Sequence, residues 1–200
     1  MDYALKLASI FFTMILVDNY VLAKFLGICP FLGVSKKLDS AVGMSLAVTF
    51  VMVMATAATW PIYTFVLEPY GMAYLQTIVF ILIIAILVQL LENVLKKFIP
   101  TLYKALGVYL PLITTNCTIL GVTILNLDNG YDYVESIVCA AGAGIGFLVA
   151  MVLFSGVRRR VEQAMPPKSF EGLPITLVAA AMVSLSFMGF GGIVEAIFGA

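Results

Sequence analysis

Long apolar stretches alternate with short polar connections along this chain. A helix needs about 20 mostly apolar residues to cross the roughly 30 Å hydrocarbon core of a bilayer. Six stretches meet this length and are predicted to span a membrane: Tyr3–Leu26, Ala41–Leu67, Tyr74–Leu95, Leu102–Leu125, Tyr133–Val157 and Leu173–Phe198. The connections are too short to hold a catalytic domain outside the membrane. The pattern therefore predicts an all-α integral membrane protein.

The positively charged residues are distributed unevenly among these connections. Nine of the eleven Lys and Arg residues fall on one side of the predicted spans: Lys36, Lys37, Lys96, Lys97, Lys104, Arg158, Arg159, Arg160 and Lys168. The connections on the other side carry acidic residues such as Asp128 and Asp132 and no basic residue. Because basic loops stay in the cytoplasm, both termini are expected on the outer side of the membrane.

The six spans divide into two halves of three, residues 1–98 and 99–200. An odd number of spans per half means that the halves cross the membrane in opposite directions, as in inverted repeats, which place functional sites near the midplane. Two short segments support a duplication. Cys29-Pro-Phe-Leu-Gly-Val34 and Cys117-Thr-Ile-Leu-Gly-Val122 are identical at four of six positions.

Both cysteine segments are expected to interrupt a helix. The apolar stretch from Ala4 to Val34 has 31 residues, about 46 Å as a helix, which is too long for one upright span. Gly27, Pro30 and Gly33 flank Cys29, so the first helix is predicted to break there. In the second half Pro111 and Gly121 bracket Cys117, and polar residues 114–116 precede it. Spans one and four are therefore predicted to be broken helices.

The composition limits the class of protein and the kinds of site that this chain can form. The chain is 62% hydrophobic and 11% charged, with zero net charge, which excludes an ordinary soluble domain and makes nucleic acid an unlikely partner. It contains no histidine. Histidine-ligated haem, Rieske centres and Cys-His or Ser-His nucleophiles are therefore excluded.

Three cysteines remain as candidate ligands. Thiolates favour zinc, copper(I) and iron–sulfur clusters. Cys29 and Cys117 are paired by the duplication, and a four-thiolate site would need two more cysteines from another polypeptide. Cys139 lies in an apolar span without a counterpart and is interpreted as a packing residue. The residues alone leave three possibilities open for Cys29 and Cys117: a shared metal or cluster, a disulfide, or two idle buried thiols.

Two further features bear on function. Charged residues inside a membrane are candidates for an ion path; Asp18 is the stronger candidate here and Glu92 the weaker one. Gly142-Ala-Gly144-Ile-Gly146 imitates part of a dinucleotide-binding loop, but no strand precedes it. Close helix packing by small residues explains this segment better.

Several segments resemble the signature sequences of the NqrDE/RnfAE family over essentially the whole chain. They are Leu26–Lys37, Gly107–Cys117, Asn19–Phe25 and Ser184–Phe190. The resemblance implies a six-span inverted-repeat protein of the bacterial inner membrane, paired with a homologous, oppositely inserted protein (the E subunit of the Rnf complex). Each partner would give two cysteines to an intramembrane [2Fe-2S] cluster. On this chain the implied ligands are Cys29 and Cys117.

The resemblance also implies an activity. Complexes of this family pass electrons between ferredoxin and NAD⁺ through flavins and iron–sulfur clusters on other subunits, and couple this to Na⁺ or H⁺ movement. This chain has no flavin or nicotinamide motif and would serve as an electron relay within the complex. A redox-silent transporter or channel component, or a structural scaffold, would share the same inverted spans and is the alternative.

Overall fold

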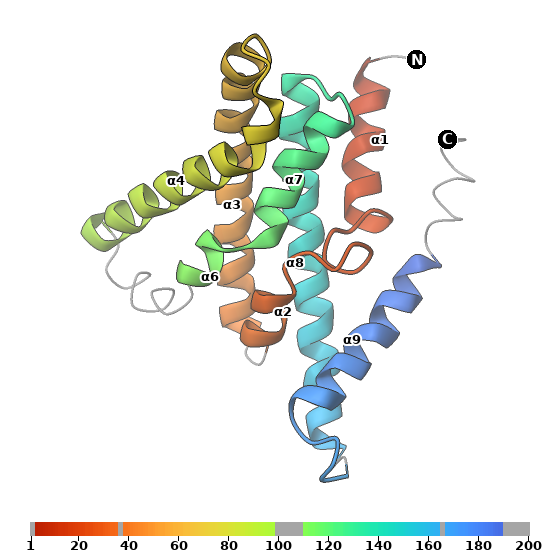
Figure 1. Ribbon diagram of the computed structural model, residues 1–200. Coiled ribbons are helices and arrows are strands. Elements are labelled where there is room, and N and C mark those ends of the chain that lie inside the picture. Colours follow the sequence, from red (N-terminus) through yellow and green to blue (C-terminus); the bar gives the residue numbers. More distant parts are fainter. Residues whose placement is uncertain (1–2, 36–37, 99–109, 165–166, 190–200) are drawn as a thin grey trace.

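The computed structural model describes residues 3–35, 38–98, 110–164 and 167–189. Within these ranges the chain is helical (Figure 1). The elements are α1 (Tyr3–Leu16), α2 (Ile28–Val34), α3 (Leu38–Ile62), the π-helical turn η1 (Tyr63–Leu67), the 3₁₀ turn η2 (Ala73–Leu75), α4 (Gln76–Phe98), α6 (Leu110–Thr114), α7 (Cys117–Asp128), α8 (Tyr133–Gln163) and α9 (Leu173–Met188).

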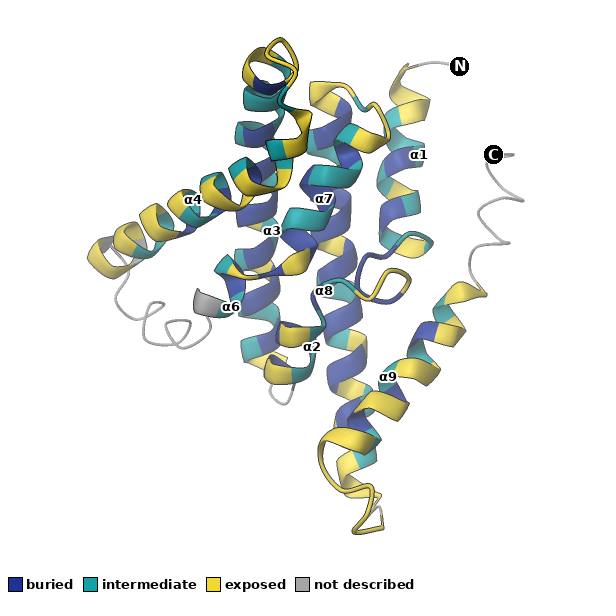
Figure 2. Ribbon diagram, in the orientation of Figure 1, coloured by how far each residue is buried: buried dark blue, intermediate teal, exposed yellow. Residues whose placement is uncertain are grey.

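The centre of the molecule is the antiparallel pair α3 and α8, with α1 and α7 packed beside it (Figure 1). Buried residues are concentrated on these helices, whereas α4 leans away from the bundle and is largely exposed (Figure 2). The core is filled by large side chains such as Met44 and Met52 of α3 and Phe147 and Phe154 of α8. An exposed helix with a long apolar stretch, such as Ile78–Val88 of α4, suits contact with lipid or with another polypeptide.

Small residues let α8 approach its neighbours closely. A Cβ atom on Gly144 would lie 2.5 Å from Thr49 Cγ2 of α3, and one on Gly146 would lie 2.9 Å from the carbonyl oxygen of Met14 in α1. A Cβ on Gly142 would lie 3.1 Å from the carbonyl oxygen of Phe11. The prediction that this glycine run serves helix packing is confirmed.

Three continuous helical segments in the described ranges are long and apolar enough to cross a membrane: Leu38–Leu67, Ala73–Val94 and Tyr133–Gln163. Shorter apolar helices cover Tyr3–Leu16, Leu112–Asp128 and Leu173–Met188. The prediction of an all-α fold with long apolar helices is thus confirmed. Residues 102–109 of the predicted fourth span and 190–198 of the sixth lie outside the described residues.

The predicted boundary of the first span was wrong. Helix α1 ends at Leu16 and not at Leu26, and residues 17–27 form an irregular segment before α2. The side chain of Asn19 explains the early end. Its Oδ1 accepts hydrogen bonds from the N–H groups of Val21 and Leu22, and its Nδ2 donates to the carbonyl oxygen of Gly146 at 2.7 Å. Asparagine in this role competes with the helical hydrogen-bond pattern.

The interruption therefore lies before Cys29, not around it. Cys29, Pro30 and Gly33 all belong to α2. Pro30 is compatible with α2 because it occupies the first turn, where its missing N–H would have no helical partner. Gly27, just before the helix, has φ +80° and marks the actual end of the irregular segment.

The second interruption lies between α6 and α7, at Thr115 and Asn116. Asn116 is the N-cap of α7, and its Oδ1 accepts a hydrogen bond from the N–H of Thr118 at 3.0 Å. Gly121 lies inside α7 without disturbing it. Both predicted interruptions therefore exist, while the repeat relation between residues 1–98 and 99–200 stays a prediction.

The basic residues after the fifth predicted span do not lie in a loop. Helix α8 continues six residues beyond Val157 to Gln163, so Arg158, Arg159 and Arg160 are helical. This arrangement places basic side chains near the C-terminal end of α8 and the acidic residue Glu135 in its first turn, as the helix dipole favours. Lys36, Lys37 and Lys104 lie outside the described residues, and the orientation in the membrane stays a prediction.

Candidate thiol site

Each of the two paired cysteines lies in the first turn of a helix. Cys29 is the second residue of α2 and Cys117 is the first residue of α7. The two helices start near the middle of the molecule and run toward opposite ends (Figure 1). Both thiols are exposed and free, so neither the predicted disulfide alternative nor the buried-thiol alternative describes this structure.

A hydrogen bond joins the two cysteine segments directly. The backbone N–H of Gly27 donates to Cys117 Sγ at 2.9 Å. Because Cys29 follows Gly27 by two residues, its Cα lies within about 7 Å of the Cα of Gly27. The two segments that carry the cysteines, 90 residues apart at the contact, are thus brought together.

This contact requires glycine at position 27. The φ of +80° is a conformation that residues with a Cβ rarely adopt. A Cβ would also lie 2.1 Å from Thr118 Oγ1 and 3.2 Å from Asn116 Oδ1. The glycine therefore allows the irregular segment to pass directly over the first turn of α7.

Cys117 lies at the N-terminal end of a helix and accepts a backbone hydrogen bond. The first N–H groups of a helix point outward without helical partners and carry a partial positive charge. Cys117 begins the twelve-residue helix α7 and also receives the Gly27 N–H. The sulfur therefore accepts the Gly27 N–H at the start of α7, and a thiolate is the form of cysteine that binds metal ions.

A hollow of about 330 Å³ opens beside Cys117. One wall is apolar and comes from α4, and the other is polar and comes from the α6–α7 junction. The lining residues are Ile81, Ile84, Ala85, Thr114, Thr115, Asn116, Cys117 and Leu120. Among the described residues, Asn116 Nδ2 and the nearby Thr118 Oγ1 are buried and have no hydrogen-bond partner.

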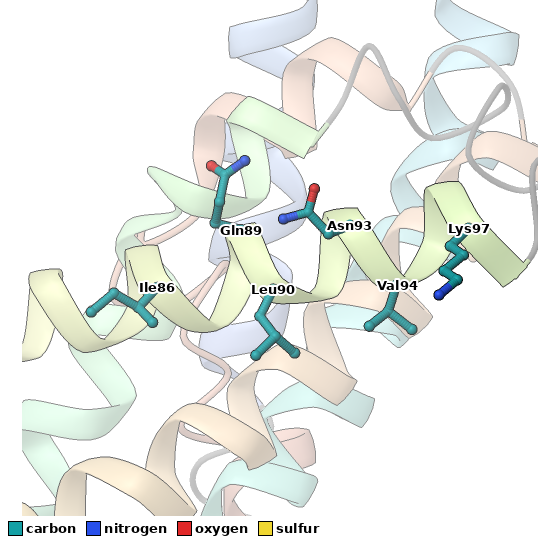
Figure 3. A pocket seen from close by; sticks show the side chains of 6 residues that line it. All are labelled: Ile86, Gln89, Leu90, Asn93, Val94 and Lys97. Atoms are coloured by element: carbon teal, nitrogen blue, oxygen red, sulfur yellow. The ribbon is translucent and has the colours of Figure 1, made fainter.

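A second hollow of about 550 Å³ lies farther along α4 and contains no cysteine. Its described lining comes from α4 alone: Ile86, Gln89, Leu90, Asn93, Val94 and Lys97. Figure 3 shows the amide side chains of Gln89 and Asn93 on the opposite side of the helix from Leu90 and Val94. No thiol or carboxylate contributes to the described lining of this hollow, so it is not part of the candidate site.

Asp18 lies in the irregular segment between α1 and α2. Its carboxylate is 3.8 Å from Lys24 Nζ, and both side chains are partly exposed. The same ammonium lies 4.8 Å from the centre of the Tyr20 ring. Asp18 is thus close in sequence to the thiol site and already has a cationic neighbour, and its predicted place on an ion path stays a prediction. Glu92 lies apart from it, on α4.

Cys139 is separate from the other two cysteines. It is fully buried within α8, in the hydrophobic core, as expected of a small packing residue. Within the described ranges no group of three or more Cys, Asp or Glu side chains converges to hold a metal ion. The described part of the chain therefore offers two exposed thiols, Cys29 and Cys117, and their completion by a second polypeptide stays a prediction.

The sequence did not reveal the roles of three residues that build the site. Asn19 ends α1, and its position beside Asp18 within an apolar stretch was the available signal. The backbone N–H of Gly27 donates to Cys117, and no sequence pattern indicates that a backbone N–H will bond a distant side chain. Asn116, noticed only as one of three polar residues, carries a recognisable signal as an N-cap before an apolar run.

Comparison with known proteins agrees with the predicted resemblance. Residues 7–194 match the family described as "Rnf-Nqr subunit, membrane protein". The chain is 53% identical to the A subunit of the Na(+)-translocating ferredoxin:NAD(+) oxidoreductase complex of Acetobacterium woodii, over 94% of this chain and 98% of that protein. It is 53% identical to the A subunit of the ion-translocating oxidoreductase complex of Syntrophotalea carbinolica, over 90% and 93%. The corresponding protein of Proteus mirabilis is 49% identical, over 97% and 98%. The chain therefore belongs to the Rnf-Nqr family of membrane protein subunits.

Proposed function

We propose that this chain is the A subunit of an ion-translocating oxidoreductase complex of the Rnf type. Relatives with that name match 94% and 90% of its length, one of them in a Na⁺-translocating ferredoxin:NAD⁺ oxidoreductase complex. The chain has no soluble domain of its own in the described ranges. It would therefore serve within the complex, with ferredoxin and NAD⁺ handled by other subunits that carry flavins and iron–sulfur clusters.

We further infer that Cys29 and Cys117 are ligands of a [2Fe-2S] cluster. The observation that carries this inference is the Gly27–Cys117 hydrogen bond, which brings the two cysteine segments together at the start of oppositely directed helices. Both thiols are free and exposed, as ligands to a shared group must be. A [2Fe-2S] cluster takes four ligands, and this chain supplies two. The homologous six-helix partner, the E subunit of the Rnf complex, would supply the others.

When bound, such a cluster supplies one-electron transfer within the membrane. The residues of this chain would hold it and adjust its surroundings. The Gly27 N–H donates to the Cys117 sulfur, which lies at the N-terminal end of α7. Hydrogen bonds to the ligand sulfurs and the degree of solvent exposure are known determinants of cluster potential.

The same site offers a physical reason for coupling to ion movement. A change of net charge is costly in the low dielectric of a membrane interior, so a compensating cation is favoured nearby. Inverted halves that meet at such a site suit access from alternating sides. We propose that electron transfer at the thiol site is coupled in this way to outward movement of Na⁺ or H⁺. Asp18 is the candidate residue of this chain for the ion path.

The ligand assignment is tested in the purified, assembled complex. Cys29→Ser and Cys117→Ser should each abolish one electron spin resonance signal of the reduced complex and lower the iron and acid-labile sulfide content. Cys139→Ala is the matched control, because that thiol is buried away from the site. It should leave iron, sulfide and spin signals unchanged.

The alternative function has a different signature. A redox-silent transporter component would retain its ion movement without iron bound by this chain. If Cys29→Ser and Cys117→Ser both left iron, sulfide and every spin signal at the level of the unmodified complex, the ligand assignment would be wrong. The redox-silent alternative would then describe the chain better.

A further inference from the structure

Helix α2 carries Cys29 but is too short to hold its own position. It has seven residues, whereas isolated helices shorter than about 12–15 residues are marginal in water even with favourable sequences. Its placement must come from contacts with other elements. It buries Pro30, Phe31 and Val34 and leaves Cys29 exposed on another face. Whatever fixes the rotation of α2 therefore fixes the direction of this thiol.

One of those contacts is aromatic. The ring of Phe31 stacks on the ring of Phe154 in α8, with centroids 4.2 Å apart and planes inclined by 23°. Both side chains are fully buried or nearly so. Stacking of this kind holds the middle of α2 against α8, and α2 also packs against α3 and α6. A stacked ring face by itself does not fix the rotation of the helix.

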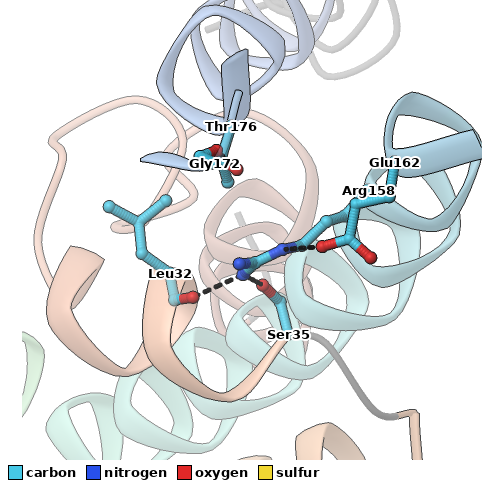
Figure 4. A network of polar contacts seen from close by, with 6 residues as sticks. All are labelled: Leu32, Ser35, Arg158, Glu162, Gly172 and Thr176. Carbon is cyan, nitrogen blue, oxygen red and sulfur yellow. Dashed lines mark hydrogen bonds and ion pairs between the residues drawn. The ribbon is translucent and has the colours of Figure 1, made fainter. Parts of the chain in front are cut away.

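The second contact is at the C-terminal end of α2. The last carbonyl groups of a helix lack helical partners. Arg158 of α8 donates from Nη1 to the carbonyl oxygen of Leu32 and, at 2.8 Å, to Ser35 Oγ. Its Nε donates to Glu162 Oε1 at 3.3 Å (Figure 4). A guanidinium at this end also complements the negative pole of the helix.

The burial of Arg158 is informative. Its side chain is 10% exposed, whereas that of Glu162 is 54% exposed. A buried guanidinium is costly unless its N–H groups are satisfied. Glu162 is partly solvated and lies on the same helix as Arg158. Within the described residues, the hydrogen bonds of Arg158 to another element, to Leu32 O and Ser35 Oγ, are both at the C-terminal end of α2. Phe154 and Arg158 are four residues apart and thus lie on one face of α8.

We propose that Arg158 is the positioning residue that fixes α2, and with it Cys29, relative to Cys117. Cys117 does not depend on Arg158 in this way, because α7 is capped by Asn116 and packs on α3 and α8. The experiment below measures two quantities. One of them, the cluster signal, rests on the proposed function. The second readout, the proximity of two thiols, does not require a cluster.

The test uses the assembled complex with Arg158→Gln and Arg158→Lys. Arg160→Gln is the matched control, since Arg160 lies on the same helix, is exposed and loses the same charge. The first readout is the midpoint potential and line shape of the spin signal that Cys29→Ser abolishes. The second is cross-linking of Cys29 to Cys117 by a short bis-methanethiosulfonate, which forms a disulfide with each thiol and releases methanesulfinate, after removal of iron, with the linked peptides identified by mass spectrometry.

Arg158→Gln should shift the potential and line shape and lower the Cys29–Cys117 cross-link by about fivefold, because two acceptors at the end of α2 lose a charged donor. Arg158→Lys keeps the charge without the fork of donors, so its effect should be intermediate. Arg160→Gln should match the unmodified complex. Ser35→Ala, which removes one acceptor only, should act in the same direction to a smaller extent. It provides the test if Arg158→Gln prevents assembly.

The outcomes separate this inference from the proposed function. If Cys29→Ser abolishes the cluster signal while Arg158→Gln, or Ser35→Ala in its place, leaves potential, line shape and cross-link unchanged, Arg158 does not position α2. An equal effect of Arg160→Gln would also overturn the proposal, since a general loss of charge would explain it. If Cys29→Ser leaves the cluster signals intact but Arg158→Gln still lowers the cross-link, the positioning role stands and the ligand assignment does not.

Discussion

The backbone N–H of Gly27 donates a hydrogen bond to the sulfur of Cys117, 2.9 Å away and 90 residues later in the chain. A residue of the first interrupted stretch therefore contacts the cysteine of the second. Gly27, which precedes the first cysteine, and Cys117 look independent in the sequence. In the structure they form one unit. A disturbance at either position is expected to affect both thiols.

Gly27→Ala tests this unit. The new Cβ would lie 2.1 Å from Thr118 Oγ1, and the residue would have to keep φ near +80°. The left-handed conformation costs a residue with a Cβ about 1–2 kcal/mol. Overpacking typically adds about 1–3 kcal/mol. We expect a clear fall in the melting temperature of the purified complex, measured by differential scanning fluorimetry, and a loss of the cluster signal.

Gly33→Ala is the control for this change. Gly33 lies four residues after Cys29, has no positive φ, and has open space where a Cβ would be. Alanine is the better helix former by about 1 kcal/mol, so this variant should melt at the same temperature or slightly higher. Equal destabilisation by both substitutions would show that the Gly27 contact does not matter for stability.

The packing of α8 against α1 is open to a similar comparison. A Cβ at position 146 would lie 2.9 Å from the backbone carbonyl oxygen of Met14, an atom that cannot move without the helix. Gly156 of the same helix has nothing within 4 Å. Gly146→Ala should lower the melting temperature through an overpacking cost of about 1–3 kcal/mol, while Gly156→Ala should not. A neutral Gly146→Ala would contradict the close approach of α1 and α8.

An ion pair joins α1 to the first turn of α8. Lys6 Nζ lies 2.6 Å from Glu135 Oε1, and the Glu135 side chain is 3% exposed. Lys6→Met should destabilise the protein because it leaves a buried carboxylate whose described partner is then the N–H of Asp132. Adding Glu135→Gln should recover part of the lost melting temperature by removing the unpaired charge.

Lys24→Met is the comparison for that pair. Lys24 and Asp18 are 3.8 Å apart and both partly exposed, so their pairing contributes little to stability. The melting temperature should barely change. If Lys6→Met were as mild as Lys24→Met, the buried Glu135 would not depend on its lysine partner.

The role of Asp18 in ion movement is tested separately from stability. In vesicles with reduced ferredoxin and NAD⁺, Asp18→Asn should lower Na⁺ or H⁺ uptake per electron transferred, since the substitution removes the charge without changing the shape of the side chain. Asp128→Asn, in an exposed position at the end of α7, should leave the ratio unchanged. An Asp18→Asn complex that pumps at the unmodified rate would remove this residue from the path.

Hydropathy and local pattern were sufficient for the helical class and for several details. The apolar lengths predicted the long helices α3, α4 and α8, because hydrophobic periodicity and span length are local properties. The repeated six-residue segment marked Cys29 and Cys117 as candidate ligands. Cys139 has no such segment and was interpreted as a packing residue. The close packing at Gly142, Gly144 and Gly146 followed from residue size alone.

The exact place of each interruption depended on tertiary contacts. Gly and Pro near Cys29 suggested a break around that residue, yet α1 ends at Leu16 because Asn19 bonds the carbonyl oxygen of Gly146 on another helix. Arg158 looked like its neighbours Arg159 and Arg160 in a basic run. It differs from them only because α8 continues past Val157 and turns its side chain onto α2.

The amino-acid sequence by itself thus determined the helical class, the long apolar helices and the residues that are small enough to pack closely. The tertiary structure alone decided that the Gly27 amide meets Cys117 and that Arg158 meets the end of α2. Local helix formation is encoded within a few neighbouring residues. A hydrogen bond between distant segments, in contrast, depends on how every intervening helix packs.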